Sequence, residues 1–178
     1  MLRSVSSMPR LPARPKDGHK GTFGKVLIIA GSVGMSGAAI LAGHGALRSG
    51  AGLVHIACPQ PIQELVAAGN PCYLTTGLPA VADGTLAATA IDAILPLLAS
   101  ARCVAIGPGL GKTPAIVEIL DQVLRQFPGQ IVIDADGLTA YKALHATGRL
   151  EQRKVPLLLT PHPGEMSQLI DVPIQVIQ

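Results

Sequence analysis

The sequence predicts an α/β domain built around a mainly parallel sheet. Short apolar runs rich in branched residues recur along the chain, and longer segments with helical periodicity separate them. The chain has 178 residues, of which 48% are hydrophobic and 14% charged, so its composition suits one domain with a filled core. Its 20 glycines and 15 prolines supply the tight loops that such an alternation requires.

Five runs are expected to be strands because they are apolar nearly throughout, as strands covered on both faces are. They are Lys25–Ala30, Gly52–Ala57, Arg102–Ile106, Gln130–Asp134 and Val155–Thr160. Right-handed crossovers would place helices on both faces of the sheet. Ligands then bind beyond the carboxyl ends of the strands, so the loops at that edge are the first place to look for a site.

Five helices are expected between and after these strands. They are Met35–Ser49, Pro61–Ala68, Thr85–Ser100, Pro114–Gln126 and Gly137–Ala146. The fourth is the clearest, because its apolar residues share one face and Glu118, Asp121, Gln122 and Arg125 share the other. Thr113 and Pro114 predict its start, as an N-cap and a first-turn proline.

The composition argues against nucleic-acid binding and against a structural metal or disulfide framework. The net charge is +3 without a basic stripe, and two Tyr, two Phe and no Trp leave few stacking platforms for bases. The three cysteines, Cys58, Cys72 and Cys103, have no paired spacing. Two of them lie in or beside predicted strands, where we expect buried thiols, and a cytoplasmic location is expected.

Two segments resemble targeting or membrane sequences. Residues 1–15 are basic and contain no acid, but their second half favours an extended lead-in, so the domain is expected to span residues 16–178. Val26–Leu47 carries no charged residue and is long enough to cross a bilayer. Five glycines interrupt it, and it divides into a strand, a turn and a helix. We therefore predict no membrane association.

The first candidate loop is Gly31–Ala39, which follows the first predicted strand. Its glycines allow a sharp turn and a close backbone approach to a ligand, and the helix that follows offers unpaired N–H groups to an anion. Alternatively, Gly37, Ala38 and Ala39 are small only because the helix lies close to the sheet. The loop by itself does not separate these interpretations.

The second candidate loop is Gly107–Thr113. It resembles a P-loop, but Gly107 and Gly111 bracket only three residues, and Ile106 stands where the first glycine of that motif is needed. The dinucleotide motif Gly-x-Gly-x-x-Gly is absent after the first strand as well. Three glycines within five residues still favour a ligand contact, although a plain tight turn remains the alternative.

Two further loops carry ionisable residues at strand ends. Asp134 is a functional candidate because a carboxylate at such a position needs a donor or a cation. Asp136 is expected to cap the following helix. His162 lies between two prolines and can bind a ligand phosphate or ring. Glu165 falls in the first turn of a short helix, where it either positions Mg²⁺ through water or favours the helix N-terminus.

Taken in order, these motifs resemble the NAD(P)H-hydrate dehydratase family of the ribokinase-like superfamily. The matching segments are His19–Gly24, Gly31–Ala39, Leu47–Leu53, Gly107–Gly111, Asp134–Leu138 and Thr160–Glu165. The resemblance implies a three-layer ribokinase-like domain. It also implies a repair reaction in which ADP or ATP, with Mg²⁺, phosphorylates the stray ring hydroxyl of hydrated NADH or NADPH. Loss of phosphate then restores the nucleotide.

The resemblance also implies roles for individual residues. The expected contacts with the hydrated nucleotide are Ala38, Gly109, Gly111 and His162. Glu165 matches an acidic position near metal and phosphate in the superfamily, and Asp134 is a second candidate there.

In the family, a lysine-glycine segment and a Gly-x-Gly-Asp loop with the catalytic aspartate follow the histidine loop. Only 13 residues follow Glu165 here, so we expect that aspartate to lie beyond Gln178. The expectation is a C-terminally truncated, partial domain that is inactive alone and self-associates through an exposed sheet edge. Two alternatives remain open: another ribokinase-like small-molecule kinase, and a non-catalytic nucleotide-binding remnant.

Overall fold

The computed structural model describes residues 13–148, 150 and 157–177. Most of the predicted lead-in, residues 1–12, therefore lies outside the described residues. Arg14 already contacts the domain: its guanidinium lies 3.5 Å from the centre of the Phe23 ring and donates a hydrogen bond to the carbonyl of Gly50 at 3.2 Å.

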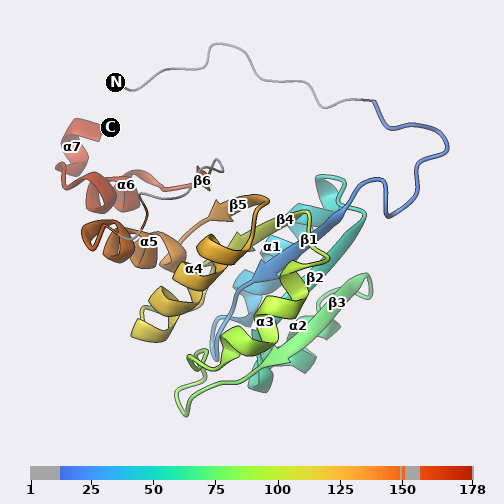
Figure 1. Cartoon of the computed structure of the whole chain (residues 1–178), viewed down its shortest axis with the longest axis horizontal. Coiled ribbons are helices and arrows are strands. Elements are labelled where there is room, and N and C mark those ends of the chain that lie inside the picture. The colour runs from blue at the N-terminus through green and yellow to red at the C-terminus, as the bar shows by residue number, and fades with distance from the viewer. Residues whose placement is uncertain (1–12, 149, 151–156, 178) are drawn as a thin grey trace.

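The described strands form one six-stranded sheet in the order β3-β2-β1-β4-β5-β6, with every pair parallel (Figure 1). Their bounds are β1 Lys25–Ile29, β2 Leu53–Pro59, β3 Tyr73–Leu78, β4 Cys103–Ile106, β5 Gln130–Ile133 and β6 Leu157–Leu159. The predicted parallel sheet is confirmed. Residues 155 and 156 of the last predicted strand lie outside the described residues.

Helices cover the sheet on both faces and complete a three-layer α/β/α architecture (Figure 1). They are α1 Ser36–Arg48, α2 Gln63–Ala68, α3 Ala90–Leu98, α4 Pro114–Gln126, α5 Asp136–Ala146, α6 Pro163–Ile170 and α7 Ile174–Ile177, with a 3-10 turn at Gln60–Ile62. α1 and α2 pack on one face, for example Ala39 and Val66 on Ile56. α3, α4 and α5 pack on the other face.

The strand β3 was not predicted, because its sequence lacks the apolar run of the other strands. It is the outer strand beside β2, and it carries two threonines and a glycine instead of an apolar run. Leu78 is the one buried residue of the strand. An edge strand that is only partly covered lacks the continuous apolar signal on which the other strands were recognised.

The helix expected from Thr85 begins at Ala90 instead. Residues 79–87 form a small hairpin-like flap, with an antiparallel bridge between Ala80 and Leu86. Gly84 stands at its tip with φ +80°, and its N–H donates to the carbonyl of Val81 at 2.9 Å. The Asp-Gly pair is a turn signal, and it outweighs the helical periodicity of the residues that follow.

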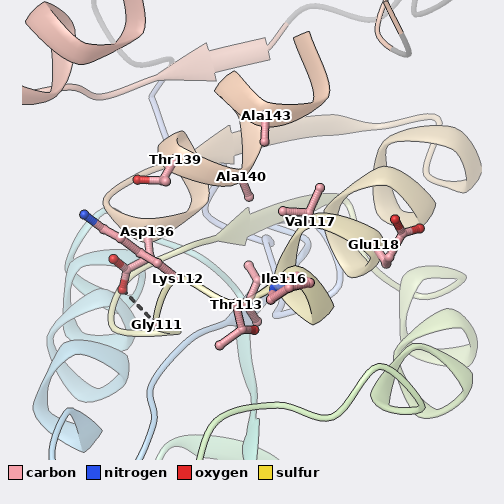
Figure 2. Close-up of a pocket in the computed structure, with 11 residues that line it drawn as sticks. Gly111, Lys112, Thr113, Ile116, Val117, Glu118, Asp136, Thr139, Ala140 and Ala143 are labelled. Carbon is pink, nitrogen blue, oxygen red and sulfur yellow. Dashed lines mark hydrogen bonds between the residues drawn. The ribbon is translucent and has the colours of Figure 1, made fainter. Parts of the chain in front are cut away.

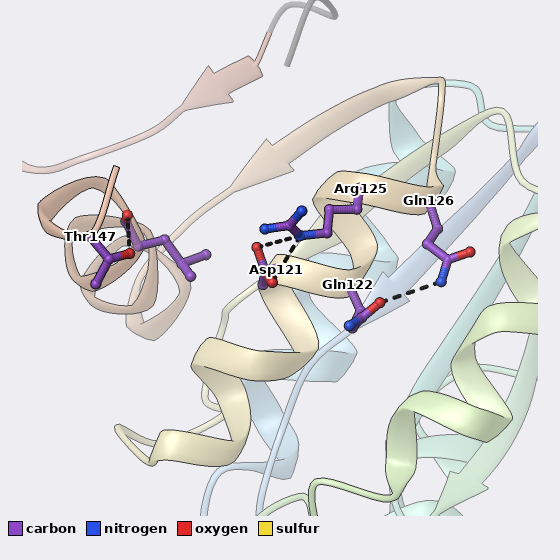
Figure 3. A network of polar contacts seen from close by, with 6 residues as sticks. Asp121, Gln122, Arg125, Gln126 and Thr147 are labelled. Atoms are coloured by element: carbon purple, nitrogen blue, oxygen red, sulfur yellow. Dashed lines mark hydrogen bonds and ion pairs between the residues drawn. The ribbon is translucent and has the colours of Figure 1, made fainter. Parts of the chain in front are cut away.

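One residue on the polar face of α4 is buried. Asp121 is 2% exposed, and both its carboxylate oxygens accept from Nε of Arg125 at 3.0 Å (Figure 3). The pair is four residues apart on one helix, and Arg125 stays half exposed and shields the carboxylate. Periodicity places Asp121 on the polar face of α4 and does not say what covers that face.

The segment long enough to cross a bilayer, Val26–Leu47, divides into β1, a loop and α1, as predicted. Among the described residues, no helix combines the length and the apolar character needed to span a membrane.

Candidate functional site

The direction in which successive strands are added to the sheet reverses between β1 and β4, and this places the loops after these two strands side by side. From β1 the chain continues outward to β2 and β3, then returns across the sheet to β4 and continues the other way. Such a switch point leaves a crevice beyond the carboxyl ends of the two central strands. The loop after β1 and the loop after β4 are therefore the walls of the candidate site.

Two hydrogen bonds tie these walls together. The N–H of Gly31 donates to the carbonyl of Pro108 at 2.8 Å. The hydroxyl of Ser32, which is 2% exposed, donates to the carbonyl of Gly109 at 2.8 Å. A buried hydroxyl needs such a partner, so Ser32 fixes one loop against the other. This role of Ser32 was not predicted, because nothing in the local sequence marks a serine whose partner is 77 residues away.

The structure brings two of the expected substrate contacts together. Gly109 has φ +67°, and a Cβ at this position would lie 2.9 Å from the Cβ of Ala38 and 3.1 Å from the Cβ of Met35. Only glycine fits both the backbone angle and the space. The absence of a side chain at Gly109 is thus required by its close contact with Ala38. This is a contact between the two loops and not between helix and sheet, so both interpretations of the first loop stay predictions.

The backbones at the carboxyl ends of β4 and β5 lie very close to each other. Gly107 has φ +131°, and a Cβ there would lie 1.8 Å from the carbonyl oxygen of Asp134. A Cβ on Gly137 would lie 2.7 Å from the carbonyl of Ile106, which also accepts from the N–H of Asp134 at 3.1 Å. The glycines at this edge therefore let two chain segments touch, in addition to any ligand they contact.

The side chain of Asp136 bonds to the second glycine loop and not to its own helix. Its Oδ2 accepts from the N–H of Gly111 at 2.9 Å (Figure 2). The N-cap position of α5 is Ala135, with φ 50° and no capping side chain. The prediction that Asp136 caps the helix is therefore wrong. The turn from Asp134 through a residue with positive φ starts α5 one residue earlier than predicted and directs the carboxylate toward Gly111.

Thr113 stands at the N-cap of α4 and Pro114 in its first turn, as predicted, but the threonine side chain makes no capping bond. Its Oγ1 is buried and has no hydrogen-bond partner among the described residues. Thr113 is one of the residues that line a pocket of about 400 Å³ between the N-terminal halves of α4 and α5 (Figure 2). Lys112 and Asp136 are charged residues at its polar side, and Val117 and Ala140 are among its apolar residues.

His162 and Glu165 form a capping box at the start of α6. Nδ1 of His162 accepts from the N–H groups of Gly164 at 3.1 Å and of Glu165 at 3.3 Å. In return, Oε2 of Glu165 accepts from the N–H of His162 at 3.0 Å. Both residues therefore satisfy helix N–H groups that would otherwise lack partners, which matches the helix N-terminus alternative for Glu165.

The predicted site residues thus fall into two groups. Ala38 in the first turn of α1 and Gly109 and Gly111 after β4 lie beside the tied loops, whereas His162 and Glu165 follow β6, and Asp134 follows β5 between them. At about 4.8 Å per strand, β6 is about 10 Å from β4 and about 14 Å from β1. In the described part of the chain, no hydrogen bond joins the two groups.

The residues present do not form a magnesium site by themselves. Among residues 13–148, 150 and 157–177, no group of three or more His, Cys, Asp or Glu side chains lies close enough to hold a metal ion. One oxygen of the Glu165 carboxylate accepts from the N–H of His162 at 3.0 Å. The metal roles of Glu165 and Asp134 stay predictions, and no chemical step is assigned to Mg²⁺ here.

The cysteines lie apart from these loops. Cys58 is buried in β2, where burial raises the pKa of its thiol to about 11, as expected for an unreactive core residue. Cys103 is partly buried in β4, and Cys72 is exposed.

A family model described as NAD(P)H-hydrate dehydratase matches residues 26–178. The bifunctional NAD(P)H-hydrate repair enzyme Nnr of Moorella thermoacetica is 41% identical over 178 residues, which are all of this chain and 33% of that protein. The ADP-dependent (S)-NAD(P)H-hydrate dehydratase of Bacillus subtilis is 36% identical over 170 residues, 94% of this chain and 55% of that protein.

Solved structures of the same kind share the fold. The ADP/ATP-dependent NAD(P)H-hydrate dehydratase from Bacillus subtilis, co-crystallised with ATP and Mg²⁺, aligns with a TM-score of 0.67 at 32% identity and covers 93% of this chain and 53% of that one. A ribokinase-like superfamily protein from Enterococcus faecalis aligns with a TM-score of 0.75 at 26% identity, over 92% of this chain and 54% of that one.

The chain therefore spans about half the length of these dehydratases and one third of the bifunctional enzyme. The α/β sheet, its ribokinase-like relatives and the family model agree with one another. This chain belongs to the NAD(P)H-hydrate dehydratase family.

Proposed function

We propose that this chain supplies the substrate-binding part of an ADP- or ATP-dependent NAD(P)H-hydrate dehydratase. The reaction transfers a phosphoryl group to the stray ring hydroxyl of (6S)-hydrated NADH or NADPH, and loss of phosphate restores the nucleotide. One observation carries the proposal: Ser32 holds the two glycine loops at the switch point of the sheet together, and Asp136 of α5 holds the second loop in place. The two loops present Ala38, Gly109 and Gly111 at the edge where such sheets bind ligands.

The chemistry of these loops suits a nucleotide. Helices α1 and α4 both start beside the crevice, and their first N–H groups and positive dipole ends favour a phosphate. Gly111, which lines the pocket beside α4, allows a ligand to approach its backbone closely. The role of these residues is to bind and orient the hydrate. No residue of this chain is assigned as the base.

Isothermal titration of the chain with hydrated NADPH tests the proposal, with unmodified NADPH and ATP as separate titrants. We expect hydrate to bind without ATP turnover. Gly109→Val should abolish hydrate binding, and Gly45→Ala in α1 is the matched control because a Cβ there meets nothing within 4 Å. Binding of neither hydrate nor ATP would remove the support for the substrate contacts.

The same titration addresses the two alternatives. A non-catalytic nucleotide-binding module would bind ATP and not distinguish hydrated from intact NADPH. Another ribokinase-like kinase would bind a different alcohol, which a panel of vitamin-like alcohols would reveal under the same conditions.

A further inference from the structure

The imidazole of His162 is held by its own helix through one ring nitrogen. Nδ1 accepts two backbone N–H groups, from Gly164 at 3.1 Å and Glu165 at 3.3 Å. Two donors pointing at one nitrogen require a lone pair on it, so Nδ1 carries no proton. In the neutral ring the proton must then lie on Nε2. The helix cap therefore selects one of the two tautomers.

Glu165 holds the other side of the same residue. Its Oε2 accepts from the backbone N–H of His162 at 3.0 Å, and its Oε1 lies 3.4 Å from Nε2 of the ring. A carboxylate facing Nε2 stabilises a proton there, which reinforces the tautomer chosen by the cap. Glu165 thus fixes both the main chain and the ring of His162.

The ring nevertheless remains available to a ligand. The His162 side chain is 68% exposed, whereas that of Glu165 is 23% exposed. The separation of 3.4 Å between Nε2 and Oε1 exceeds the usual N–H···O range, so the contact does not saturate the N–H donor. The outward side of Nε2–H can still bond to an acceptor oxygen.

We propose that Glu165 is a positioning residue that holds His162 as the Nε2–H tautomer, so that the imidazole acts as a hydrogen-bond donor to an oxygen of the bound nucleotide. The donor role depends on the function proposed above. With Nδ1 occupied by backbone donors and Nε2 protonated, the ring has no free basic nitrogen. His162 is therefore a donor and not a general base while α6 keeps its cap.

Two substitutions at position 165 separate the ring contact from the helix cap. Glu165→Gln retains an oxygen that accepts from the His162 N–H, since the capping box uses either Glu or Gln. It places an amide N–H₂ opposite Nε2–H, so two donors face each other. Glu165→Ala removes both contacts. His162→Ser keeps a good N-cap and removes the imidazole.

The readout is the ¹⁵N spectrum of the histidine-labelled chain, in which protonated and unprotonated ring nitrogens resonate in separate ranges. His162→Ser assigns the His162 signals by their loss. We expect the wild-type chain to show an unprotonated Nδ1 and a protonated Nε2, and Glu165→Gln to show a mixture of tautomers while thermal unfolding stays close to wild type. A wild-type ring protonated at Nδ1, or a Glu165→Gln spectrum identical to wild type, would overturn the positioning role.

Titration with hydrated NADPH tests the donor role separately. Loss of this hydrogen bond should weaken hydrate binding by about tenfold in His162→Ser, which keeps the N-cap and removes the imidazole. Equal affinity in both chains would overturn the donor role even if the tautomer is as expected. A wild-type chain with the expected tautomer that binds no hydrate would instead contradict the proposed function, because the spectrum does not depend on any ligand.

Discussion

The carboxylate of Asp136 accepts a hydrogen bond from the backbone N–H of Gly111 at 2.9 Å, across 25 positions of the chain. This bond joins the first residue of α5 to the loop that precedes α4. It is charge-assisted and partly buried, which places it among the stronger hydrogen bonds of a protein. The conformation of the second glycine loop therefore depends on a side chain from the next strand-helix unit.

Replacement of Asp136 should show this dependence. Asp136→Leu leaves the Gly111 N–H without its acceptor and should lower the free energy of unfolding by about 1.5–3 kcal/mol. Asp136→Asn keeps an acceptor oxygen at the same place and should cost about 1 kcal/mol or less. Urea unfolding of the wild type and of both variants measures these free energies of unfolding. Equal stability of the Leu and Asn variants would show that the bond does not hold the loop.

Gly109→Val should destabilise the fold as well as remove hydrate binding. The position has φ +67°, where a residue with a Cβ is strained by about 1–2 kcal/mol, and the new Cβ would overlap Ala38. The control, Gly45→Ala, lies in the exposed part of α1 and should stabilise by about 0.5–1 kcal/mol. Thermal unfolding of both variants gives the comparison. A Gly109→Val chain as stable as wild type would contradict the close packing of the two loops.

The stability of the fold should fall in mild acid because of His55. Nε2 of this residue lies 2.7 Å from the hydroxyl of Thr76, and its Nδ1 is buried without a partner among the described residues. Burial, and then the charge of Lys25, lower the pKa of His55 below 6.5. The unfolded chain, with a pKa near 6.5, therefore binds this proton first as the pH falls. Stability should decrease below about pH 6.5 until the lowered pKa is passed.

Urea unfolding between pH 5 and 8 measures this effect as the difference between wild type and His55→Gln. Carboxylates contribute equally to both chains, so the difference isolates His55. If wild type and His55→Gln lose stability in parallel, the buried imidazole does not control the acid response.

Self-association should occur at the β6 edge. β6 is the outer strand of the described sheet, and Leu158 on it is 58% exposed. Unpaired edge strands with apolar side chains favour pairing between copies, which a lysine opposes. Sedimentation of wild type and Leu158→Lys should show a lower average mass for the variant. Leu41→Lys also replaces an exposed leucine, but on α1, and it should leave the average mass unchanged. A lower average mass in both variants would contradict association through the β6 edge.

Much of the architecture follows from local patterns. The bounds of α4 were predicted to the residue, and the alternation of apolar runs predicted a parallel sheet, because strands covered on both faces must be apolar throughout. β3 escaped prediction because it is an edge strand, and the start of α3 was misplaced because a turn at Gly84 interrupts a helical pattern. Hydrophobic periodicity predicts an element where its apolar residues are buried, and it gives no clear signal where the element is only partly buried.

The sequence by itself determined the fold class and the four loops at one sheet edge, because glycine, proline and apolar periodicity act over a few residues. Only the tertiary structure decided what those loops contact. The bonds from Ser32 to Gly109 and from Gly111 to Asp136 span 77 and 25 residues, and they exist because β1, β4 and β5 are neighbours in the sheet. A side chain's partner depends on that strand order, which no local spacing encodes.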